Sequence, residues 1–422
     1  MMRLLAGAVG ALALAVSTPS SARDVGDELV IDRTRIDLAL QDMVRSGRTV
    51  GASVLIWKDG EEAYFVAEGL ADREEFKPFE RDTLVQIFSM TKPVTGVALM
   101  QLWEQGKFRL DDPLAWYLPQ FAEMYVLKGT DENGKPILEP ATRHIAIRDI
   151  MRHTAGFTYG GEENFADMVW LMLEPLSPDH DLAKFAQLLA DVPLLYEPGA
   201  EWRYSAAVDV QARLVEVLSS QPFDEYVRDH IFLPLGMADS GWKRDPAEIE
   251  RLAAIYGATP QGTLERESEE WRLVRNFAGK PMTMGGAGIV TTIDDYMRFA
   301  RMLLNEGELG GIRVLQPSTV RLMATDQLDP AVTERQWLGS KGTGGFGLDF
   351  FVRTAPPQTP EENRGAVGEF FWDGLASTLF WVDPANDMAV VFMTQKIPFD
   401  GTLHHDIRDA IYGNDYLGPG TE

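Results

Sequence analysis

Apolar positions in the first quarter of the chain predict two helices and a hairpin. Residues 36–47 have apolar side chains at helical spacing. Residues 49–71 predict two strands that turn at Lys58-Asp59-Gly60, a strong hairpin signal. The run 94–103 is apolar on nearly every side of a helix, which indicates a buried helix.

The pattern changes between residue 107 and about residue 280. Residues 181–192 and 209–220 have helical spacing, and loops rich in proline, glycine and charge separate such segments. Nothing in this stretch predicts a ladder of strands. We therefore expect an all-helical domain over 107–280.

The last third of the chain predicts strands again. A glycine-rich loop near residue 282 leads into a helix with Thr292 as its expected N-cap. Four strand candidates follow, the last two turning at residues 383–386, and a helix closes the chain; they are 346–352, 366–372, 377–384, 388–395 and 404–413.

Strands at both ends and helices between them predict an α+β fold. Residues 27–106 and 281–415 are expected to form one mixed α/β domain, whose antiparallel sheet both termini build. The helical domain is inserted between these two parts.

The N-terminus, residues 1–22, is predicted to be a signal peptide. A cationic start precedes an apolar run over 4–16, and Ser20 and Ala22 suit cleavage after Ala22. This predicts an exported protein, periplasmic or secreted. A membrane anchor or a buried helix is the alternative, but the run is short for a membrane span and no later stretch is long enough.

Composition excludes several functional classes. The chain has no cysteine, so it has no disulfide, thiol nucleophile or cysteine-bound metal, which suits a large exported bacterial enzyme. Its net charge of −25 argues against nucleic acid and anionic membranes as partners. Histidine spacing predicts no metal site, the glycines at 285–288 lack a nucleotide-binding frame, and no cofactor is expected. Oligomeric state stays open.

Ser89 lies three residues before Lys92, so the two share one face of a helix. A buried lysine with a lowered pKa can take the proton of a serine hydroxyl. Pro93 is tolerated only in the first helical turn, which places the helix start and its positive end close to Ser89. The spacing is common by chance, and a helix cap is the simpler interpretation of Ser89 by itself. A second copy, Ser240 to Lys243, lies in a loop and is set aside.

Tyr204 stands at the start of another helix, after a turn at Pro198 and Gly199. A tyrosine beside a serine and a lysine can relay a proton, although a half-buried aromatic residue is the simpler interpretation. Asp209, one turn further, is either a hydrogen-bond acceptor that supports the site or an ordinary helix residue, and we favour the latter interpretation. His153 is interpreted as a turn or core residue, while His404 and His405 are expected at the surface.

Three segments together resemble a known superfamily. Ser89-Met90-Thr91-Lys92, Tyr204-Ser205-Ala206 and Trp372-Asp373-Gly374 resemble the motifs of the serine β-lactamases and penicillin-binding proteins. The chain is most similar to the β-lactamase-like (family VIII) carboxylesterases and acyltransferases, from about residue 30 to 412. That family has the α+β fold predicted above. Two rival matches are set aside: Lys341 in "KGTGGFG", expected in a loop, and Tyr412 to Asn414, expected in the tail.

The resemblance implies a mechanism. Ser89 would attack an ester carbonyl, Lys92 and Tyr204 would move the proton, and which of them is the base stays open. The backbone N–H groups of Ser89 and Leu375 would form the oxyanion hole. Trp372, Asp373 and Gly374 would contact the substrate, with Trp372 in the acyl pocket.

Departures from the β-lactamase motifs favour esters. Ala206 replaces the asparagine that holds a β-lactam amide, and Trp372 replaces a cation that binds its carboxylate. If the side chain of Asp373 faces the cleft, it would disfavour anionic acyl groups; its direction stays open. The alternatives are a β-lactamase, D-amino peptidase or related amidase, and a non-catalytic relative that binds cell-wall peptides. The expected partner is a small-molecule ester.

Overall fold

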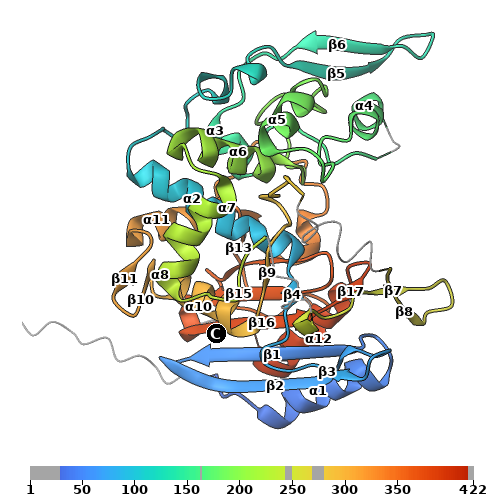
Figure 1. Cartoon of the computed structure of the whole chain (residues 1–422), viewed down its shortest axis with the longest axis vertical. Helices are drawn as coiled ribbons and strands as arrows, with labels where there is room; N and C mark the ends of the chain where they lie inside the picture. The colour runs from blue at the N-terminus through green and yellow to red at the C-terminus, as the bar shows by residue number, and fades with distance from the viewer. Residues whose placement is uncertain (1–28, 162–163, 243–249, 269–279, 417–422) are drawn as a thin grey trace, which may run out of the picture.

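The computed structural model describes residues 29–161, 164–242, 250–268 and 280–416 (Figure 1). The predicted signal peptide and Lys243 lie outside these ranges, and the signal peptide stays a prediction. Among the described residues, we find no helix with the length and apolar character needed to cross a membrane.

An eight-stranded antiparallel sheet joins the two ends of the chain (Figure 1). Its strand order is β12-β13-β14-β15-β16-β1-β2-β3. β1 pairs with β16, which places Val54 opposite Phe392. The prediction that both termini build the sheet is therefore confirmed. The strands are β1 (Gly51–Lys58), β2 (Glu61–Asp72), β3 (Lys77–Pro78), β12 (Gly344–Phe346), β13 (Phe351–Arg353), β14 (Phe370–Asp373), β15 (Leu379–Asp383) and β16 (Met388–Thr394).

Three helices pack on this sheet. α1 (Arg33–Arg45) lies against β1 and β2 and beside α12 (Gly401–Tyr412), while α10 (Ile293–Leu304) packs on β1, β15 and β16. Thr292 caps α10 as predicted, since its side chain accepts a hydrogen bond from the Asp295 N–H. Every residue of β15 and β16 is buried, as expected for central strands covered by helices.

The helical part lies above the sheet, and its central helix is α2 (Thr91–Glu104) (Figure 1). α2 packs on α6 (Ala207–Ser219) and is apolar nearly all round, as predicted, with most of its residues buried. The other helices among the described residues are α3 (Ile147–Met151), α4 (Phe165–Leu173), α5 (Leu182–Ala190), α7 (Phe223–Val227), α8 (Leu233–Leu235), α11 (Pro317–Met323), the π-helix η4 (Arg228–Phe232) and the 3₁₀ helices η1 (Phe88–Met90), η2 (Leu114–Trp116), η3 (Pro119–Phe121), η6 (Leu338–Lys341) and η7 (Pro384–Asn386).

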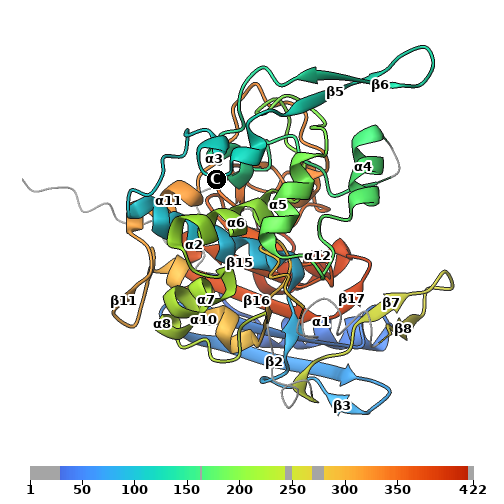
Figure 2. The same cartoon turned by 45° about the horizontal axis from the view of Figure 1, so that its top comes forward.

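The prediction of an all-helical insertion without paired strands is wrong. A hairpin of β5 (Tyr125–Thr130) and β6 (Pro136–Pro140) projects from the helical part (Figure 2). A second hairpin, β7 (Tyr256–Ala258) with β8 (Leu264–Arg266), pairs in parallel with β17 (Lys396–Ile397). Most residues of β5 and β6 are exposed, so these strands lack the alternation by which a half-buried strand is recognised.

Short pairings bring distant segments to the start of α2. β4 (Val85–Gln86) pairs with β9 (Val290–Thr291), so the glycine-rich loop before β9 lies beside the residues that begin α2. The Ile289 N–H donates to Thr91 Oγ1 at 3.1 Å and fixes this approach. In the part of the chain that the structure describes, β10 (Glu308–Leu309) also pairs with β11 (Ile312–Arg313).

Two predictions near the C-terminus are wrong. His404 was expected at the surface, but it is buried and its Nε2 lies 2.9 Å from the Ser377 carbonyl oxygen. Tyr412 was expected in the tail, but it is the last residue of α12, is buried and donates to Asp383 Oδ2 at 2.7 Å. Both side chains lie on the sheet-facing side of α12, where the helix covers the sheet.

Candidate active site

Ser89 lies in the short helix η1, directly before α2. Pro93 falls in the first turn of α2, so the helix begins beside Ser89 as predicted. Met90 occupies the N-cap position and no side chain caps α2, which rules out the interpretation of Ser89 as its cap. Phe88 has a φ of 45°, a conformation that non-glycine residues rarely adopt. The serine is therefore presented on a strained turn at the positive end of a helix.

The side chain of Lys92 is buried and points at Ser89. Its Nζ donates to Ser89 Oγ at 3.1 Å and to the Gly286 carbonyl at 2.7 Å. Burial lowers the pKa of Lys92 to about 8, although the carboxylates of Asp209 and Asp349 favour the charged form. A neutral amine is therefore accessible near neutral pH, and it can accept the proton of the serine hydroxyl.

Tyr204 completes the group. Its ring centroid lies 4.6 Å from Lys92 Nζ, and its hydroxyl accepts from Trp372 Nε1 at 3.2 Å and shares a hydrogen bond with Ser89. Burial raises the pKa of Tyr204, so the phenol keeps its proton at neutral pH. It can pass a proton through its hydroxyl, while Lys92 is the group that can become free to take one.

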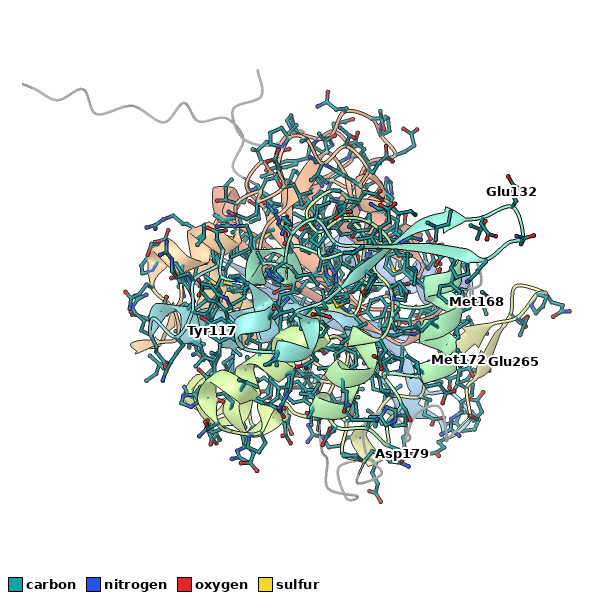
Figure 3. The ribbon with its side chains drawn as sticks, turned by 90° about the horizontal axis from the view of Figure 1, so that it is seen from above. Tyr117, Glu132, Met168, Met172, Asp179 and Glu265 are labelled. Carbon is teal, nitrogen blue, oxygen red and sulfur yellow. The ribbon has the colours of Figure 1, made fainter. Side chains whose placement is uncertain are left out.

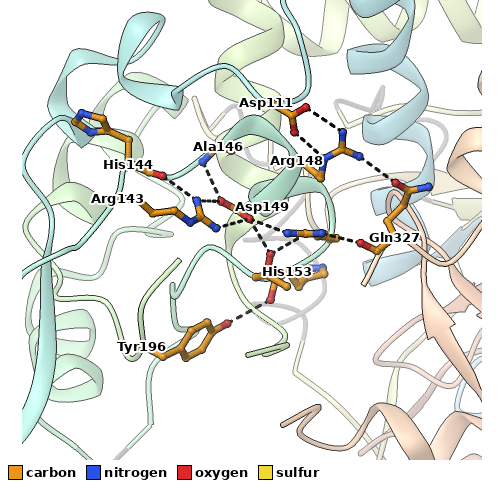
Figure 4. A network of polar contacts seen from close by, with 11 residues as sticks. Asp111, Arg143, His144, Ala146, Arg148, Asp149, His153, Tyr196 and Gln327 are labelled. Carbon is orange, nitrogen blue, oxygen red and sulfur yellow. Dashed lines mark hydrogen bonds and ion pairs between the residues drawn. The ribbon is translucent and has the colours of Figure 1, made fainter. Parts of the chain in front are cut away.

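An ionic network centred on the buried carboxylate of Asp149 lies beside the turn at His153 (Figure 4). Asp149 accepts from Arg143 Nη1 at 2.6 Å, Arg152 Nη2 at 3.2 Å and the Ala146 N–H at 2.9 Å. The network fixes the turn at His153, which is buried, has a φ of 56° and packs 4.8 Å from the Tyr204 ring. The structural interpretation of His153 is therefore confirmed.

The interpretation of Asp209 as an ordinary helix residue is wrong. Its side chain is buried, and Oδ1 accepts from the Gly286 N–H at 3.0 Å, beside Lys92. Burial raises the pKa of Asp209 to about 6, against the effect of the lysine. Asp349, which sequence reasoning did not single out, is also buried and accepts from Gln211 Nε2 at 2.9 Å. An acidic residue on the apolar face of a helix was the available signal for Asp209.

Ser89 lies between two cavities, which we call the aromatic lobe and the apolar lobe. Ser89, Tyr204 and Leu375 line both. The aromatic lobe has a volume of about 370 Å³, and its other lining residues are Trp337, Ser340, Lys341, Trp372, Asp373, Gly374 and Phe399. The apolar lobe has a volume of about 660 Å³, and its other lining residues are Phe88, Lys92, Tyr159, Trp170, Leu176, Pro178, Met282, Met284 and Ala287.

Helix α4 forms part of the wall of the apolar lobe through Trp170. The opposite side of this helix carries Met168 and Met172, which are exposed and lie at the outer edge of the molecule (Figure 3).

The prediction that Lys341 lies in a loop is wrong. It closes η6, lines the aromatic lobe and forms an ion pair with Asp373. This contact also answers the open question about Asp373, whose carboxylate faces Lys341. Trp372 is buried beside Tyr204 and lines the aromatic lobe together with Lys341 and Asp373.

The segment after β14 passes close to Ser89. A Cβ on Gly374 would lie 2.3 Å from Thr378 Oγ1 and 2.4 Å from the Ile87 carbonyl oxygen, so this approach requires glycine. Leu375 then lines both lobes beside Ser89. This position suits an oxyanion hole made by the N–H groups of Ser89 and Leu375, a role that stays a prediction.

The fold and this site define the class of the protein: the chain belongs to the β-lactamase family. The family model described as Beta-lactamase matches residues 36–411. The family and fold predictions are therefore confirmed.

The chain is similar to curated proteins and to a solved structure over most of its length. An uncharacterized protein of Mycobacterium tuberculosis is 32% identical over 398 residues, which cover 90% of this chain and 93% of that protein. The esterase EstB of Burkholderia gladioli is 28% identical, covering 90% and 94%. The solved structure of EstCE1, described as a hydrolase with promiscuous acyltransferase activity, has a TM-score of 0.74 and 27% identity, covering 90% and 98%.

Proposed function

We propose that this protein is a serine carboxylesterase that works through an acyl-enzyme on Ser89 and can pass the acyl group to water or to an alcohol. The observation that carries the proposal is the 3.1 Å contact between Ser89 Oγ and the buried amine of Lys92, with Tyr204 against both. The names of the relatives EstB and EstCE1 support the choice of ester chemistry.

The proposed reaction has two steps. Ser89 Oγ attacks the ester carbonyl as its proton moves to neutral Lys92, and the N–H groups of Ser89 and Leu375 stabilise the oxyanion. Lys92 then returns the proton to the departing alcohol through the hydroxyl of Tyr204. Water or an alcohol repeats the sequence in reverse: it loses a proton to Lys92, attacks the acyl carbonyl and releases Ser89 with its proton restored.

The lining of the aromatic lobe favours an ester over a β-lactam. A β-lactam carries a carboxylate, but the ammonium of Lys341 already pairs with Asp373. Ala206 has no side-chain amide to hold the β-lactam amide. A β-lactamase, peptidase or amidase would use the same nucleophile and the same proton path, so this class is the second candidate.

The test uses purified protein with a short-chain p-nitrophenyl ester and with nitrocefin. We expect ester turnover that falls at least about 10³-fold in Ser89→Ala. The matched control is Ser240→Ala, the serine of the second Ser-x-x-Lys segment, which hydrogen-bonds Asp295 away from the site and should keep its activity.

Three results would contradict the proposal. Ester turnover that survives in Ser89→Ala would exclude the acyl-enzyme. Faster turnover of nitrocefin than of the ester would identify a β-lactamase. A wild type inert to both, and unlabelled by a fluorophosphonate probe, would identify a non-catalytic binding protein.

A further inference from the structure

The aromatic lobe contains a buried ion pair that faces the nucleophile's cavity. Lys341 and Asp373 form this pair, and each side chain is 9% exposed. Lys341 Nζ lies 4.3 Å from the ring centroid of Phe399, 5.3 Å from that of Trp337 and 5.7 Å from that of Trp372. Three aromatic rings and a carboxylate therefore hold the ammonium in place and restrict its access to water.

The two lobes differ in the polar groups that they offer. Apart from Ser89, Lys92, Tyr159 and Tyr204, the described lining of the apolar lobe is made of apolar side chains such as Leu176, Met282 and Met284. The aromatic lobe adds a cation, an anion and the hydroxyl of Ser340 to its rings. The two halves of an ester would therefore contact different kinds of side chain on the two sides of Ser89.

An ion pair has no net charge, and this decides which ligand groups it favours. A carboxylate would be attracted by Lys341 and repelled by Asp373, and for an ammonium the two effects exchange. Removing a charged ligand group from water costs free energy, and in this nearly buried position the neutral ion pair would not compensate that cost. An uncharged hydroxyl or amide has both a donor and an acceptor, so it can donate to Asp373 and accept from Lys341 at once.

We propose that the Lys341–Asp373 pair selects esters whose acyl group carries an uncharged hydroxyl or amide, while the apolar lobe takes the alcohol half. The inference rests on the proposed esterase function and on the acyl group entering the lobe that contains Trp372. It replaces the expectation that Asp373 simply repels anions, because the charge of Asp373 is neutralised by Lys341.

The test compares four p-nitrophenyl esters that differ only at the far end of the acyl chain. They are hexanoate, ω-hydroxyhexanoate, ω-aminohexanoate and the half-ester of adipate, and butanoyl and octanoyl sets cover the reach from Ser89. We expect kcat/KM of the wild type to be about tenfold higher for the hydroxyl than for the plain chain at the best length. The ammonium and carboxylate esters should fall below the plain chain.

Single substitutions should reverse this ranking in opposite directions. In Lys341→Met the carboxylate of Asp373 is left alone, and the ammonium ester should become the best substrate. In Asp373→Asn the ammonium of Lys341 is left alone, and the carboxylate ester should become the best. The double variant has no charge in the lobe, so its charged esters should both remain poor, and the hydroxyl ester should lose its advantage over the plain chain.

The plain hexanoate ester is the reference within each variant, so a general loss of activity does not alter the ranking. If a single variant does not fold, as judged by circular dichroism, the double variant still decides between charge selection and simple packing. The same ranking in the wild type and every folded variant would overturn the inference, as would a wild type that prefers either charged ester. No turnover of any ester, with no fluorophosphonate labelling of Ser89, would instead refute the proposed function.

Discussion

Replacing Asp209 with asparagine should move the pH dependence of catalysis to lower pH. The substitution keeps the shape of the side chain, and the amide oxygen can still accept from the Gly286 N–H. It removes a buried negative charge beside Lys92. Since that charge favours the protonated lysine, its loss should lower the pKa of Lys92 further, which makes the neutral base available at lower pH.

The structure sets the size of the effect. Asp209 Oδ2 and Lys92 Nζ lie 2.8 Å and 3.3 Å from the position that a Cβ on Gly286 would occupy, so these atoms are at most about 6 Å apart. At that separation two unit charges interact by about 3 kcal/mol with an effective dielectric constant of about 20. This corresponds to about two pH units.

The assay is the pH profile of kcat/KM for a short-chain p-nitrophenyl ester. In the wild type the acid limb should reach its midpoint near the Lys92 pKa of about 8, where Asp209, with a pKa of about 6, is ionised. In Asp209→Asn the midpoint should move down by about two pH units and lie near pH 6. The control is Asp191→Asn, which makes the same chemical change at an exposed position and should leave the limb unmoved.

An unchanged or alkaline-shifted limb in Asp209→Asn would refute the reasoning. Either result would mean that Lys92 is not the titrating base, or that Asp209 does not carry its charge during turnover. A fall in kcat/KM with no change in the limb would leave Asp209 a packing residue only.

Two further substitutions test the site and its support. In Gly286→Ala the new Cβ would lie 2.8–3.3 Å from three polar side-chain atoms, so kcat/KM should fall at least about tenfold. The control Gly401→Ala meets only ordinary van der Waals contacts and should keep its activity; equal activities of the two variants would contradict this prediction. Asp149→Ala leaves buried donors unpaired and should lower the free energy of unfolding, measured in denaturant, by about 3–5 kcal/mol. The control Asp111→Ala, at an exposed position, should lower it by at most about 1 kcal/mol; equal losses would show that the network does not stabilise the fold.

The sheet and the start of α2 were predictable because their signals are local. Strands such as 388–394 are continuous apolar runs bounded by turn residues, and covering helices bury both faces of such strands. Pro93 can occupy only a first turn, so it located the start of the helix beside Ser89 without any tertiary information. The nucleophile could then be recognised once Tyr204 and Trp372 were considered with it.

The missed residues depend on contacts between distant segments. Lys341 pairs with a residue 32 positions away, and nothing around it in the sequence shows that η6 turns its amine toward β14. Asp209 could have been found only by asking which face of α6 is buried. The exposed hairpin β5–β6 gave no apolar alternation to detect.

Lys341 also explains why motif matching by itself describes this site poorly. The third motif has a tryptophan at 372, so it supplies no cation, yet an ammonium reaches the same cavity from a different segment. Asp373 cancels the charge of that ammonium. An unpaired cation can compensate the cost of desolvating a ligand carboxylate. A cation that is paired with a carboxylate cannot, so the cavity suits a polar group that carries no charge. We therefore expect the exchange of one cation for a neutral pair to change the ligand that the cavity favours, with Ser89, Lys92 and Tyr204 in their proposed roles.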